Sequence, residues 1–474
     1  MSLFAALRCK IALACLIGVA MVACGTEDPT ETASPRPHIV LVIADDLGFG
    51  DLEQFGGPQR TPALSQMAEQ GLQLDQFHAF PLCTPSRVAL MTGRSPLRDG
   101  LAWSPLRPWS ELGLAAEAQT LPEVLQAAGY RTALLGKWHL GHARAHQHPQ
   151  QQGFDHFYGF LTGAVDYFSH DSRDGGRDWQ RNGSTVQESG YVTRLLTQEA
   201  EQLIAAHDFG QPLFLMLSYS APHRPMQAPQ DTLAEMAEFT DPAARVYAAM
   251  LAEFDRGIAR VQAAIDEAGV ASDTLWVFVS DNGAALQLGG SNGELKGGKS
   301  AVTQGGLRVP AIVHWPNKID GGRISANFQT IQDIAPTLAG FAGSGFDGEV
   351  DGRDLGRSWL DPAASPPSTR AVAFVAHNDQ RGQMALISWP WKLIRRIDRE
   401  GGKVREQLFR LDSDPTESNN LIREHEERAQ ELRTILAEWI ARDPQDLSLD
   451  QLPAWQGDAP ETWKAPAAWA EAIR

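Results

Sequence analysis

Short apolar runs alternate along the chain with longer stretches of helical periodicity. Residues 39–44 are apolar without interruption, as is typical of a strand that is buried on both faces of a sheet. Similar apolar runs lie within residues 132–141, 212–223, 274–283 and 309–316. Helical spacing of apolar residues, with a glycine at or near the end, marks segments 62–71, 121–130 and 244–269. The alternation predicts an α/β fold, a three-layer sandwich around a mostly parallel central sheet.

The pattern changes near residues 361–369, where proline, serine and alanine predominate and indicate a linker or domain edge. Beyond it, apolar and polar positions alternate between turn residues, which predicts a small antiparallel sheet. The alternating segments are 370–378, 383–396 and 406–414. We therefore predict a main domain at residues 38–365 and a C-terminal subdomain at residues 366–474.

One amphipathic helix is expected to pack on this small sheet, within residues 421–443. Its apolar face consists of Ala429, Leu432, Ile435, Leu436 and Trp439. The tail at 444–474 carries Trp455, Trp463 and Trp469 among proline and alanine residues. We expect the tail to pack back onto the body, and an aromatic contact with a glycan is the alternative.

The N-terminus predicts an exported protein. Arg8 and Lys10 precede an apolar run at 11–23 that is too short to span a membrane and fits a secretory signal peptide. The sequence MVAC, followed by Gly25, resembles a bacterial lipoprotein processing site at which Cys24 is lipidated. A signal peptide at 1–23 and a tether at 24–37 would place the protein on the outer membrane, facing the periplasm or the cell surface. A plain cleaved signal peptide is the alternative.

Cysteine content and net charge argue against several kinds of site and binding partner. After processing, Cys83 is the sole cysteine besides Cys24, so a disulfide or a cysteine-based zinc site is not expected. The chain has 41 lysine and arginine residues against 58 aspartate and glutamate residues, a net charge of −17. This balance argues against binding of nucleic acid or anionic lipid through bulk charge. An anionic substrate would need a local cluster of cations.

Ionisable and amide side chains are concentrated just after the predicted strands. They are Asp45, Asp46, Lys137, His139, His223, Asp281 and Asn282. Ligands of open α/β sheets bind at the carboxyl ends of the strands, so these groups should form one site. Each aspartate-containing pair alone would also fit a helix cap or a turn, but four strand ends together favour a site. Because oxygen ligands predominate and no thiolate is available, the adjacent carboxylates favour calcium or magnesium over zinc.

Cys83 is followed by Pro85, which suits the first turn of a helix that continues to Met91. A cysteine at a helix N-terminus can have a lowered pKa and act as a nucleophile. A thiolate close to three carboxylates is, however, electrostatically unfavourable. Of the nearby basic residues, Lys137 lies against a strand end and should be buried beside an anion, whereas spacing alone assigns no role to Lys299.

The residues Cys83-Thr84-Pro85-Ser86-Arg87 resemble the C-x-P-S-R signature of the type I sulfatases, a family of the alkaline phosphatase superfamily. Further family motifs follow in the family's order. They are TGR at 92–94, GKWHLG at 136–141, SYSAPHRP at 218–225, SDNG at 280–283, GGLRVP at 305–310 and LFRLDSDPTESNNL at 408–421. The resemblance covers about residues 38–440 and implies an alkaline phosphatase-like fold and the hydrolysis of sulfate esters.

The resemblance also implies a role for each site residue. Cys83 would be oxidised after translation to formylglycine, an aldehyde whose hydrate has two hydroxyl groups. Calcium, or less readily magnesium, would be held by Asp45, Asp46, Cys83, Asp281 and Asn282. Arg87 would stabilise the hydrate, and Lys137 and Lys299 would bind the sulfate. His223, with Lys299, would assist departure of the alcohol, and His139 would take the proton of the second hydroxyl so that sulfate is expelled.

Within the family, PLCTPSR, GKWHLG and DYFSH at 166–170 are most similar to arylsulfatase B, the N-acetylgalactosamine-4-sulfatase. This likeness implies that Asp166 and His170 line the substrate pocket. A departure is Gln304, where family members often have an acidic residue. Three irregularly spaced histidines in a glutamine-rich segment, His142, His146 and His148, are expected in a solvated surface loop and not at a metal site.

The implied partners are a sulfated carbohydrate substrate, a formylglycine-generating or anaerobic sulfatase-maturating enzyme, and the membrane through the N-terminal lipid alone. Three alternatives remain at this stage. The protein could hydrolyse phosphate or phosphonate esters, it could be a non-catalytic surface glycan-binding protein, or it could be a cysteine hydrolase that uses Cys83 as a thiolate.

Overall fold

The computed structural model describes residues 36–361, 363, 370–454 and 457–473. The predicted signal peptide, Cys24 and most of the predicted tether lie outside the described residues. So do Trp455 and the predicted domain edge at 365, and these assignments stay predictions.

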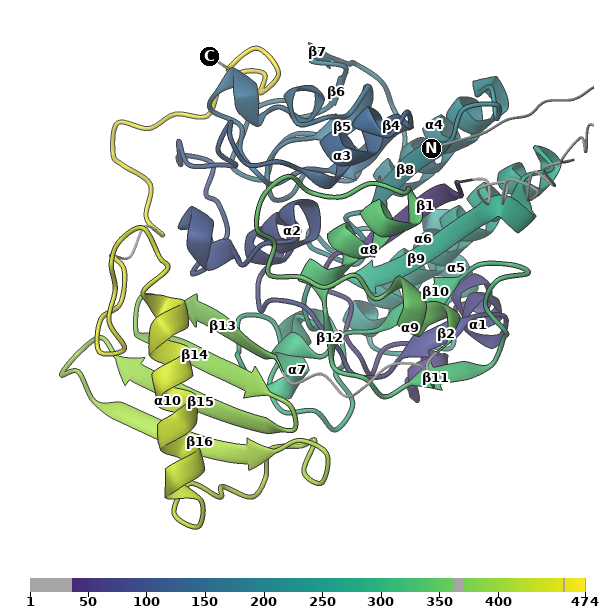
Figure 1. Ribbon diagram of the computed structural model, residues 1–474. Coiled ribbons are helices and arrows are strands. Elements are labelled where there is room, and N and C mark those ends of the chain that lie inside the picture. Colours follow the sequence, from purple (N-terminus) through teal and green to yellow (C-terminus); the bar gives the residue numbers. More distant parts are fainter. Residues whose placement is uncertain (1–35, 362, 364–369, 455–456, 474) are drawn as a thin grey trace, which may run out of the picture. The chain divides into compact units, whose positions relative to one another are not determined.

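A ten-stranded sheet forms the centre of the main domain (Figure 1). In spatial order its strands are β11 (Arg323–Ser325), β2 (Leu72–Leu74), β10 (Ala311–His314), β9 (Thr274–Ser280), β1 (His38–Ala44), β8 (Leu213–Ser218), β4 (Arg131–Lys137), β5 (His156–Phe160), β6 (Gln180–Arg181) and β7 (Ser184–Thr185). The five adjacent strands β9, β1, β8, β4 and β5 pair in parallel, whereas β10 runs antiparallel to β9. The prediction of a mostly parallel sheet is therefore confirmed.

Helices cover both faces of this sheet (Figure 1). Alternate residues of the fully buried strand β1 enter two separate apolar clusters. One cluster contains residues of α2 (Cys83–Thr92), α3 (Leu121–Ala127) and α8 (Ile334–Phe341). The other contains residues of α1 (Pro62–Glu69), α4 (Val192–Ala206) and α6 (Pro242–Glu267). Burial on both sides explains the uninterrupted apolar sequence of β1 and gives the three predicted layers.

The C-terminal subdomain is a four-stranded antiparallel sheet with one helix. Its elements are β13 (Ala371–His377), β14 (Arg381–Ser388), β15 (Trp391–Asp398), β16 (Val404–Arg410) and α10 (Glu426–Ile440). Ala429, Leu432 and Leu436 of α10 pack on one face of the sheet, as predicted. Phe374 on the opposite face belongs to the main core and contacts Phe80, with ring centroids 5.2 Å apart.

Shorter elements complete the chain. β12 (Gln329–Thr330) and β3 (Phe77–His78) form a separate parallel pair. The remaining α-helices are α5 (Gln230–Glu235), α7 (Gln304–Leu307) and α9 (Gly356–Leu360). The 3-10 turns are η1 (Glu53–Phe55), η2 (Pro96–Asp99), η3 (Ala145–Gln147), η4 (Pro149–Gln151), η5 (Ala271–Asp273), η6 (Leu286–Leu288) and η7 (Ile331–Asp333). Within the described part of the chain, no helix combines the length and the apolar composition that a membrane span requires.

The C-terminal tail packs on the main body, as predicted. Trp469 is buried, its indole N–H donates to the carbonyl oxygen of Gly175 at 3.0 Å, and its backbone N–H donates to Arg177. Trp463 meets Trp109 edge to face, with centroids 5.7 Å apart. The tail is therefore part of the folded body next to the segment around residues 100–112.

Candidate active site

The predicted site residues lie together because four parallel strands end at the same edge of the sheet. Asp45 and Asp46 follow β1, Lys137 is the last residue of β4, and Asp281 and Asn282 follow β9. The segment after β8 contributes His223. Two groups of side chains have potential ligand atoms within 4.8 Å of one another. They are Asp45, Cys83 and Asp281, and Asp45, Asp46 and His223.

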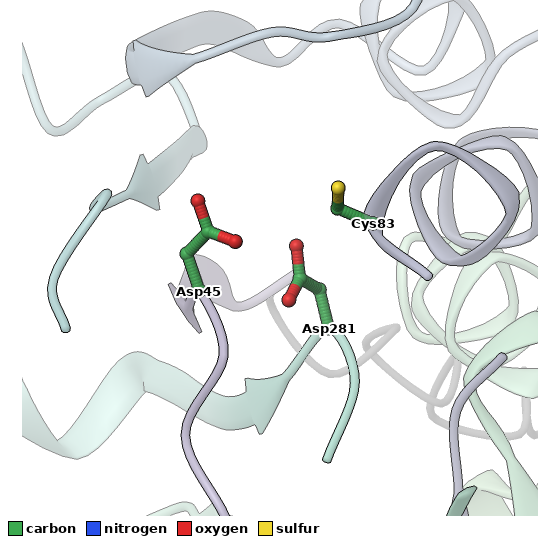
Figure 2. Close-up of side chains that lie close together, drawn as sticks. All are labelled: Asp45, Cys83 and Asp281. Carbon is green, nitrogen blue, oxygen red and sulfur yellow. The ribbon is translucent and has the colours of Figure 1, made fainter. Parts of the chain in front are cut away.

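Cys83 is the first residue of α2, in agreement with the sequence prediction. Figure 2 shows its sulfur and the carboxylates of Asp45 and Asp281 directed toward a common space. The start of α2 is fixed by Ser86, whose hydroxyl accepts from the backbone N–H of Phe80 at 2.9 Å. It is also fixed by Thr84, whose hydroxyl donates to the carbonyl of His139 at 3.2 Å. The two residues hold the helix start against the strand ends.

Arg87 lies one helical turn beyond Cys83 and is buried. Its guanidinium Nε donates to Asp281 Oδ2 at 3.1 Å, and one terminal nitrogen donates to Ser218 Oγ at 2.6 Å and to the Lys137 carbonyl at 3.0 Å. The ends of β4 and β8 lie close together at Gly136. Only glycine fits there, because a Cβ at that position would lie 2.0 Å from the Ser218 carbonyl oxygen. Arg87 therefore joins α2 to three strand ends.

Both predicted lysines pair with carboxylates of the site. Lys137 Nζ lies 2.7 Å from Asp45 Oδ2, and both side chains are fully buried. Lys299 Nζ lies 2.6 Å from Asp46 Oδ1. Burial raises the pKa of Asp46, but the charge of Lys299 and the hydrogen bonds from Lys299 and Asn282 outweigh burial and leave the pKa below its ordinary value. Sequence spacing alone could not assign Lys299 to the site, and this ion pair now does.

The donor set fits a hard divalent cation. Asp45 Oδ1 and Asn282 Oδ1 are buried oxygens without a hydrogen-bond partner. Burial and the charge of Asp45 raise the pKa of Asp281 to about 6, although Arg87 and Lys137 oppose the shift. Asp46 has a left-handed backbone with φ of 70°, which costs free energy in a non-glycine residue and indicates a constrained position. Unsatisfied oxygens and mutually repelling carboxylates are what a bound calcium would relieve.

The environment of Cys83 disfavours the thiolate. The side chain is buried, and burial raises the pKa of the thiol. Lys137 and Lys299 act in the opposite direction, but Asp281 and Asp45 add to the increase. The helix N-terminus thus does not provide an activated thiol, which argues against a cysteine hydrolase.

The two histidines differ in which ring nitrogen is available. His139 Nε2 donates to the carbonyl of Leu106 at 3.0 Å, so its buried Nδ1, which has no partner, carries the lone pair. His223 Nδ1 donates to the carbonyl of Arg224 at 2.7 Å, and Nε2 lies 3.7 Å from Asp46 Oδ2. Burial, reinforced by neighbouring lysines, holds the pKa of both histidines well below the ordinary value. Both rings are therefore neutral near pH 7, and each has a proton-accepting nitrogen.

Asp166 and His170 have structural contacts. Asp166 accepts from the backbone N–H of Ser169 at 2.8 Å and from Gln227 at 2.7 Å. His170 is buried, stacks on Trp179 and bonds to the Gly190 carbonyl at 2.9 Å. Among the residues that the structure describes, neither side chain contacts the carboxylate cluster, and their part in substrate binding stays a prediction.

The expectation of a solvated loop for the three histidines of the glutamine-rich segment is wrong for two of them. His142 is buried, bonds to the Pro108 carbonyl at 3.1 Å and meets Trp469 edge to face. His148 is buried and accepts from the backbone N–H of Gln150 at the start of η4. Irregular spacing concealed their burial because each histidine packs against a segment distant in the sequence.

Two supporting residues of the site were not predicted. Ser218 Oγ bonds to both Arg87 and the Lys137 carbonyl, and its place in the motif SYSAPHRP was the available signal. Leu106 acts through its backbone: its carbonyl accepts from His139, and its N–H donates to Thr84 Oγ1 at 3.0 Å. A backbone contact of this kind leaves no signal in residue type.

A family model described as Sulfatase matches residues 37–344. This chain belongs to the sulfatase family. The prediction made from the C-x-P-S-R signature and its companion motifs is thereby confirmed at the level of the family.

The similar proteins include several sulfatases. Arylsulfatase J of Mus musculus is 35% identical over 340 residues, which cover 70% of this chain and 57% of that protein. N-acetylgalactosamine-6-sulfatase of Homo sapiens is 35% identical over 349 residues, which cover 68% of this chain and 66% of that protein. The chain thus spans somewhat less than two thirds of these relatives. Arylsulfatase J and the 6-sulfatase differ in subtype from the N-acetylgalactosamine-4-sulfatase that the motifs PLCTPSR, GKWHLG and DYFSH suggested.

The fold also matches a solved structure. The crystal structure of Ps i-CgsB in complex with k-i-k-neocarrahexaose superimposes with a TM-score of 0.80 and 28% identity. The match covers 88% of this chain and 95% of the solved chain.

Proposed function

We propose that the protein is a sulfuric ester hydrolase that removes sulfate from a sulfated carbohydrate. The observation that carries the proposal is the position of Cys83. It starts a helix within 4.8 Å of carboxylate oxygens of Asp45 and Asp281, in surroundings that keep its thiol protonated. A cysteine there is a poor nucleophile but a suitable precursor of another group.

That group is proposed to be formylglycine, formed from Cys83 by a formylglycine-generating or anaerobic sulfatase-maturating enzyme. Its hydrate would supply an oxygen nucleophile for attack at sulfur, and calcium would draw charge from the sulfate oxygens. The residues that would hold calcium, together with residue 83, are Asp45, Asp46, Asp281 and Asn282. The unpartnered oxygens of Asp45 and Asn282 support calcium at this place.

The remaining residues have roles that follow from their contacts. Arg87 is fixed by Asp281 and Ser218 and would orient residue 83. Lys137 and Lys299 place two ammonium groups beside the carboxylates, where they would bind the sulfate oxygens. Lys299 is also the better proton donor to the departing alcohol, since neutral His223 presents a lone pair at Nε2. His139 would accept a proton at Nδ1 when sulfate is released.

A sulfated carbohydrate is the proposed substrate because similar proteins are described as carbohydrate sulfatases or in complex with a carbohydrate. One curated relative is an N-acetylgalactosamine-6-sulfatase, and the solved neighbour is described in complex with a neocarrahexaose. Export and lipidation at Cys24 remain part of the proposal and would bring the enzyme into contact with polysaccharides outside the cell. Phosphate or phosphonate ester hydrolysis has no specific observation in its favour.

The test compares sulfate-ester with phosphate-ester turnover on one preparation. The full chain is produced together with a formylglycine-generating enzyme, and the peptide containing residue 83 is analysed by mass spectrometry. We expect an aldehyde at residue 83, release of sulfate from 4-nitrophenyl sulfate and from sulfated oligosaccharides, and much slower release of phosphate. Chelation should lower turnover, with calcium restoring it better than zinc.

A Cys83→Ala variant purified in the same way is the control for contaminating activity and should release no sulfate. Full turnover by a preparation with an intact thiol and no aldehyde would overturn the proposed chemistry. Preferential turnover of phosphate esters would instead favour the phosphatase alternative.

A further inference from the structure

Asp51 is a buried carboxylate that has no role in the chemistry described above. It ends the loop at residues 45–51, here called the aspartate loop, which follows β1 and carries two of the proposed calcium ligands. Its Oδ2 accepts from the backbone N–H of Gly48 at 2.7 Å and from the hydroxyl of Tyr247 at 2.6 Å. Its Oδ1 accepts from the backbone N–H of Ser291 at 2.8 Å. A buried carboxylate is costly unless hydrogen bonds replace its hydration, so these three contacts are needed for it to stay buried.

The Asp51 carboxylate joins two loops of the active site. Ser291 belongs to the segment 284–299, here called the lysine loop, which follows the proposed calcium ligands after β9 and ends at Lys299. The backbones of the two loops also meet directly, because the N–H of Gly50 donates to the carbonyl of Ser291 at 3.0 Å. The position of the lysine loop is therefore set from the aspartate loop.

Asn292 holds the lysine loop closed from within. Its side chain is buried, its Oδ1 accepts from the backbone N–H of Ala284 at 3.0 Å, and its Nδ2 donates to the carbonyl of Gly297 at 3.0 Å. The backbone N–H of Lys299 donates to the carbonyl of Ala284 at 2.9 Å. One amide thus uses both of its polar atoms to bring the start of the loop next to its end.

The group whose position depends on these contacts is the Lys299 ammonium. It lies 2.6 Å from Asp46 Oδ1, and 18% of the lysine side chain is exposed. A lysine side chain has many rotamers, so its ammonium has a defined place only if the backbone that carries it is fixed. Displacement of a reacting group by about 1 Å can lower a rate about 10²-fold.

We propose that Asp51 and Asn292 are positioning residues that act on the reaction through Lys299. Asp51 anchors the lysine loop to the aspartate loop, and Asn292 keeps the lysine loop closed. The ammonium of Lys299 is thereby held beside Asp46. This inference rests on the proposed function, because Lys299 is assigned there to the sulfate and to the departing alcohol.

Two variants each remove one of these contacts. In Asp51→Asn the amide oxygen can still accept from Gly48 and Tyr247, but the amide nitrogen then faces the N–H of Ser291, so the anchor is lost. Asn292→Asp keeps an acceptor for the loop start but places a carboxylate oxygen against the Gly297 carbonyl, so the loop opens.

Asp255→Asn is the matched control. Asp255 is also a buried carboxylate, and its oxygens accept from the backbone N–H groups of Ala63 and Leu64 at 3.0 Å each, outside both loops. All variants are measured at pH 8, because burial raises the pKa of Asp51 to about 7 although its three hydrogen bonds oppose the shift.

The first measurement observes Lys299 without turnover. The full chain is treated with a low concentration of acetic anhydride, and peptide mass spectrometry gives the acetylation rates of Lys299 and of the exposed Lys296 in the same loop. Acetylation of Lys299 should be about tenfold faster in Asp51→Asn and in Asn292→Asp, because the ion pair with Asp46 keeps the amine protonated and limits access to it. Acetylation of Lys296 should change less than about twofold, and Asp255→Asn should change neither rate by more than that.

The second measurement is a double-mutant cycle on aldehyde-bearing enzyme. Each variant is made with and without Lys299→Met, and kcat/KM is measured for 4-nitrophenyl sulfate. Each loop variant should lower kcat/KM about tenfold when Lys299 is present and less than about twofold when it is replaced. A merely structural role would lower kcat/KM by the same factor in both backgrounds. Asp255→Asn should stay within about twofold in either background.

Unchanged acetylation of Lys299 in both loop variants, or equal losses of kcat/KM in the two backgrounds, would overturn the proposal. If Asp51→Asn does not fold, as judged by circular dichroism, Asn292→Asp decides. Failure of the proposed function has a different signature, since the aldehyde-bearing parent would then cleave no sulfate ester. The acetylation rates would in that case still decide whether the two residues position Lys299.

Discussion

At the scale of single residues, each carboxylate of the active site is paired with one cation of the same site. The pairs are Asp45–Lys137, Asp281–Arg87 and Asp46–Lys299. Their charges cancel, so the side chains alone offer little net attraction to a sulfate. A divalent cation held by the carboxylates would leave the site positive, and the lysines would become available to the sulfate oxygens. Metal and substrate are therefore expected to bind cooperatively.

The Lys299→Met variant tests whether Lys299 belongs to the active site, which sequence spacing alone could not decide. Removal of the ammonium beside Asp46 should lower kcat/KM by about 10²-fold to 10³-fold, because a donor aimed at developing charge is lost. Lys296→Met is the matched control from the same loop. Lys296 is exposed and donates only to the Glu417 carbonyl, at 3.3 Å. The measurement is steady-state sulfate release.

The control should stay within about twofold of the parent enzyme. Similar losses in both lysine variants would mean that the loop, and not the Lys299 ammonium, determines activity.

At the scale of elements, the sequence pattern predicted the long strands and helices well. β1, β4, β8 and β9 each have enough apolar residues to be recognised, and the polar residues after them could be grouped by the rule for parallel sheets. The short strands β2, β6 and β11 have two or three residues and no recognisable period. They form because neighbouring strands supply hydrogen-bond partners, which a local pattern does not contain.

Contacts between distant segments could also not be predicted from the sequence. Ser86 and Thr84 stood inside a recognised motif, so their importance could be expected, but Leu106 contributes only backbone groups. The burial of His142 depends on Trp469 of the tail, over 300 residues away. Motifs identify residue types that chemistry requires, whereas the packing partners of loops depend on the assembled fold.

The link between β3 and α7 predicts an acid sensitivity. His78 on β3 contacts Gln304 at 3.1 Å, and burial together with the charges of Lys392 and Arg308 lowers the pKa of His78 to about 3. The unfolded chain takes up this proton near pH 6.5, so acidification between pH 6.5 and 3 favours unfolding. The cost is about 2 kcal/mol at pH 5.

His78→Gln removes this titration. Relative to the parent protein, the variant should lose about 2 kcal/mol less unfolding free energy between pH 7 and pH 5, as measured by urea unfolding at each pH. An identical pH dependence in the two proteins would show that His78 takes up its proton over the same pH range in the folded and unfolded states, so that its pKa is not lowered by folding.

At the scale of the whole molecule, a buried ion pair ties the C-terminal sheet to the loop that carries Lys299. Lys392 on β15 lies 2.6 Å from Glu417, and both side chains have no exposed surface. The other carboxylate oxygen of Glu417 accepts from the backbone N–H of Gln304 at 2.8 Å. The backbone carbonyl of Glu417 also accepts from Lys296. The Glu417 carboxylate thereby fixes the Gln304 end of the segment 296–304, which contains an active-site lysine, whereas the exposed Lys296 adds only one long hydrogen bond at the other end.

Loss of Lys392 should therefore reduce both stability and activity. Lys392→Met leaves a buried carboxylate with one remaining donor and should lower the free energy of unfolding by about 3 to 5 kcal/mol. The double variant Lys392→Met with Glu417→Gln removes the unpaired charge but keeps an acceptor for Gln304, so it should regain most of that loss. Arg405→Met, at an exposed pair, should cost less than about 1 kcal/mol. Urea unfolding measures the stabilities, and sulfate release should follow the same order because the pair supports the Lys299 loop. The contrary result is a loss of unfolding free energy in the double variant that equals the sum of the losses in the two single variants. The two charges would then not interact, and the C-terminal sheet would support the active site only through its apolar contacts.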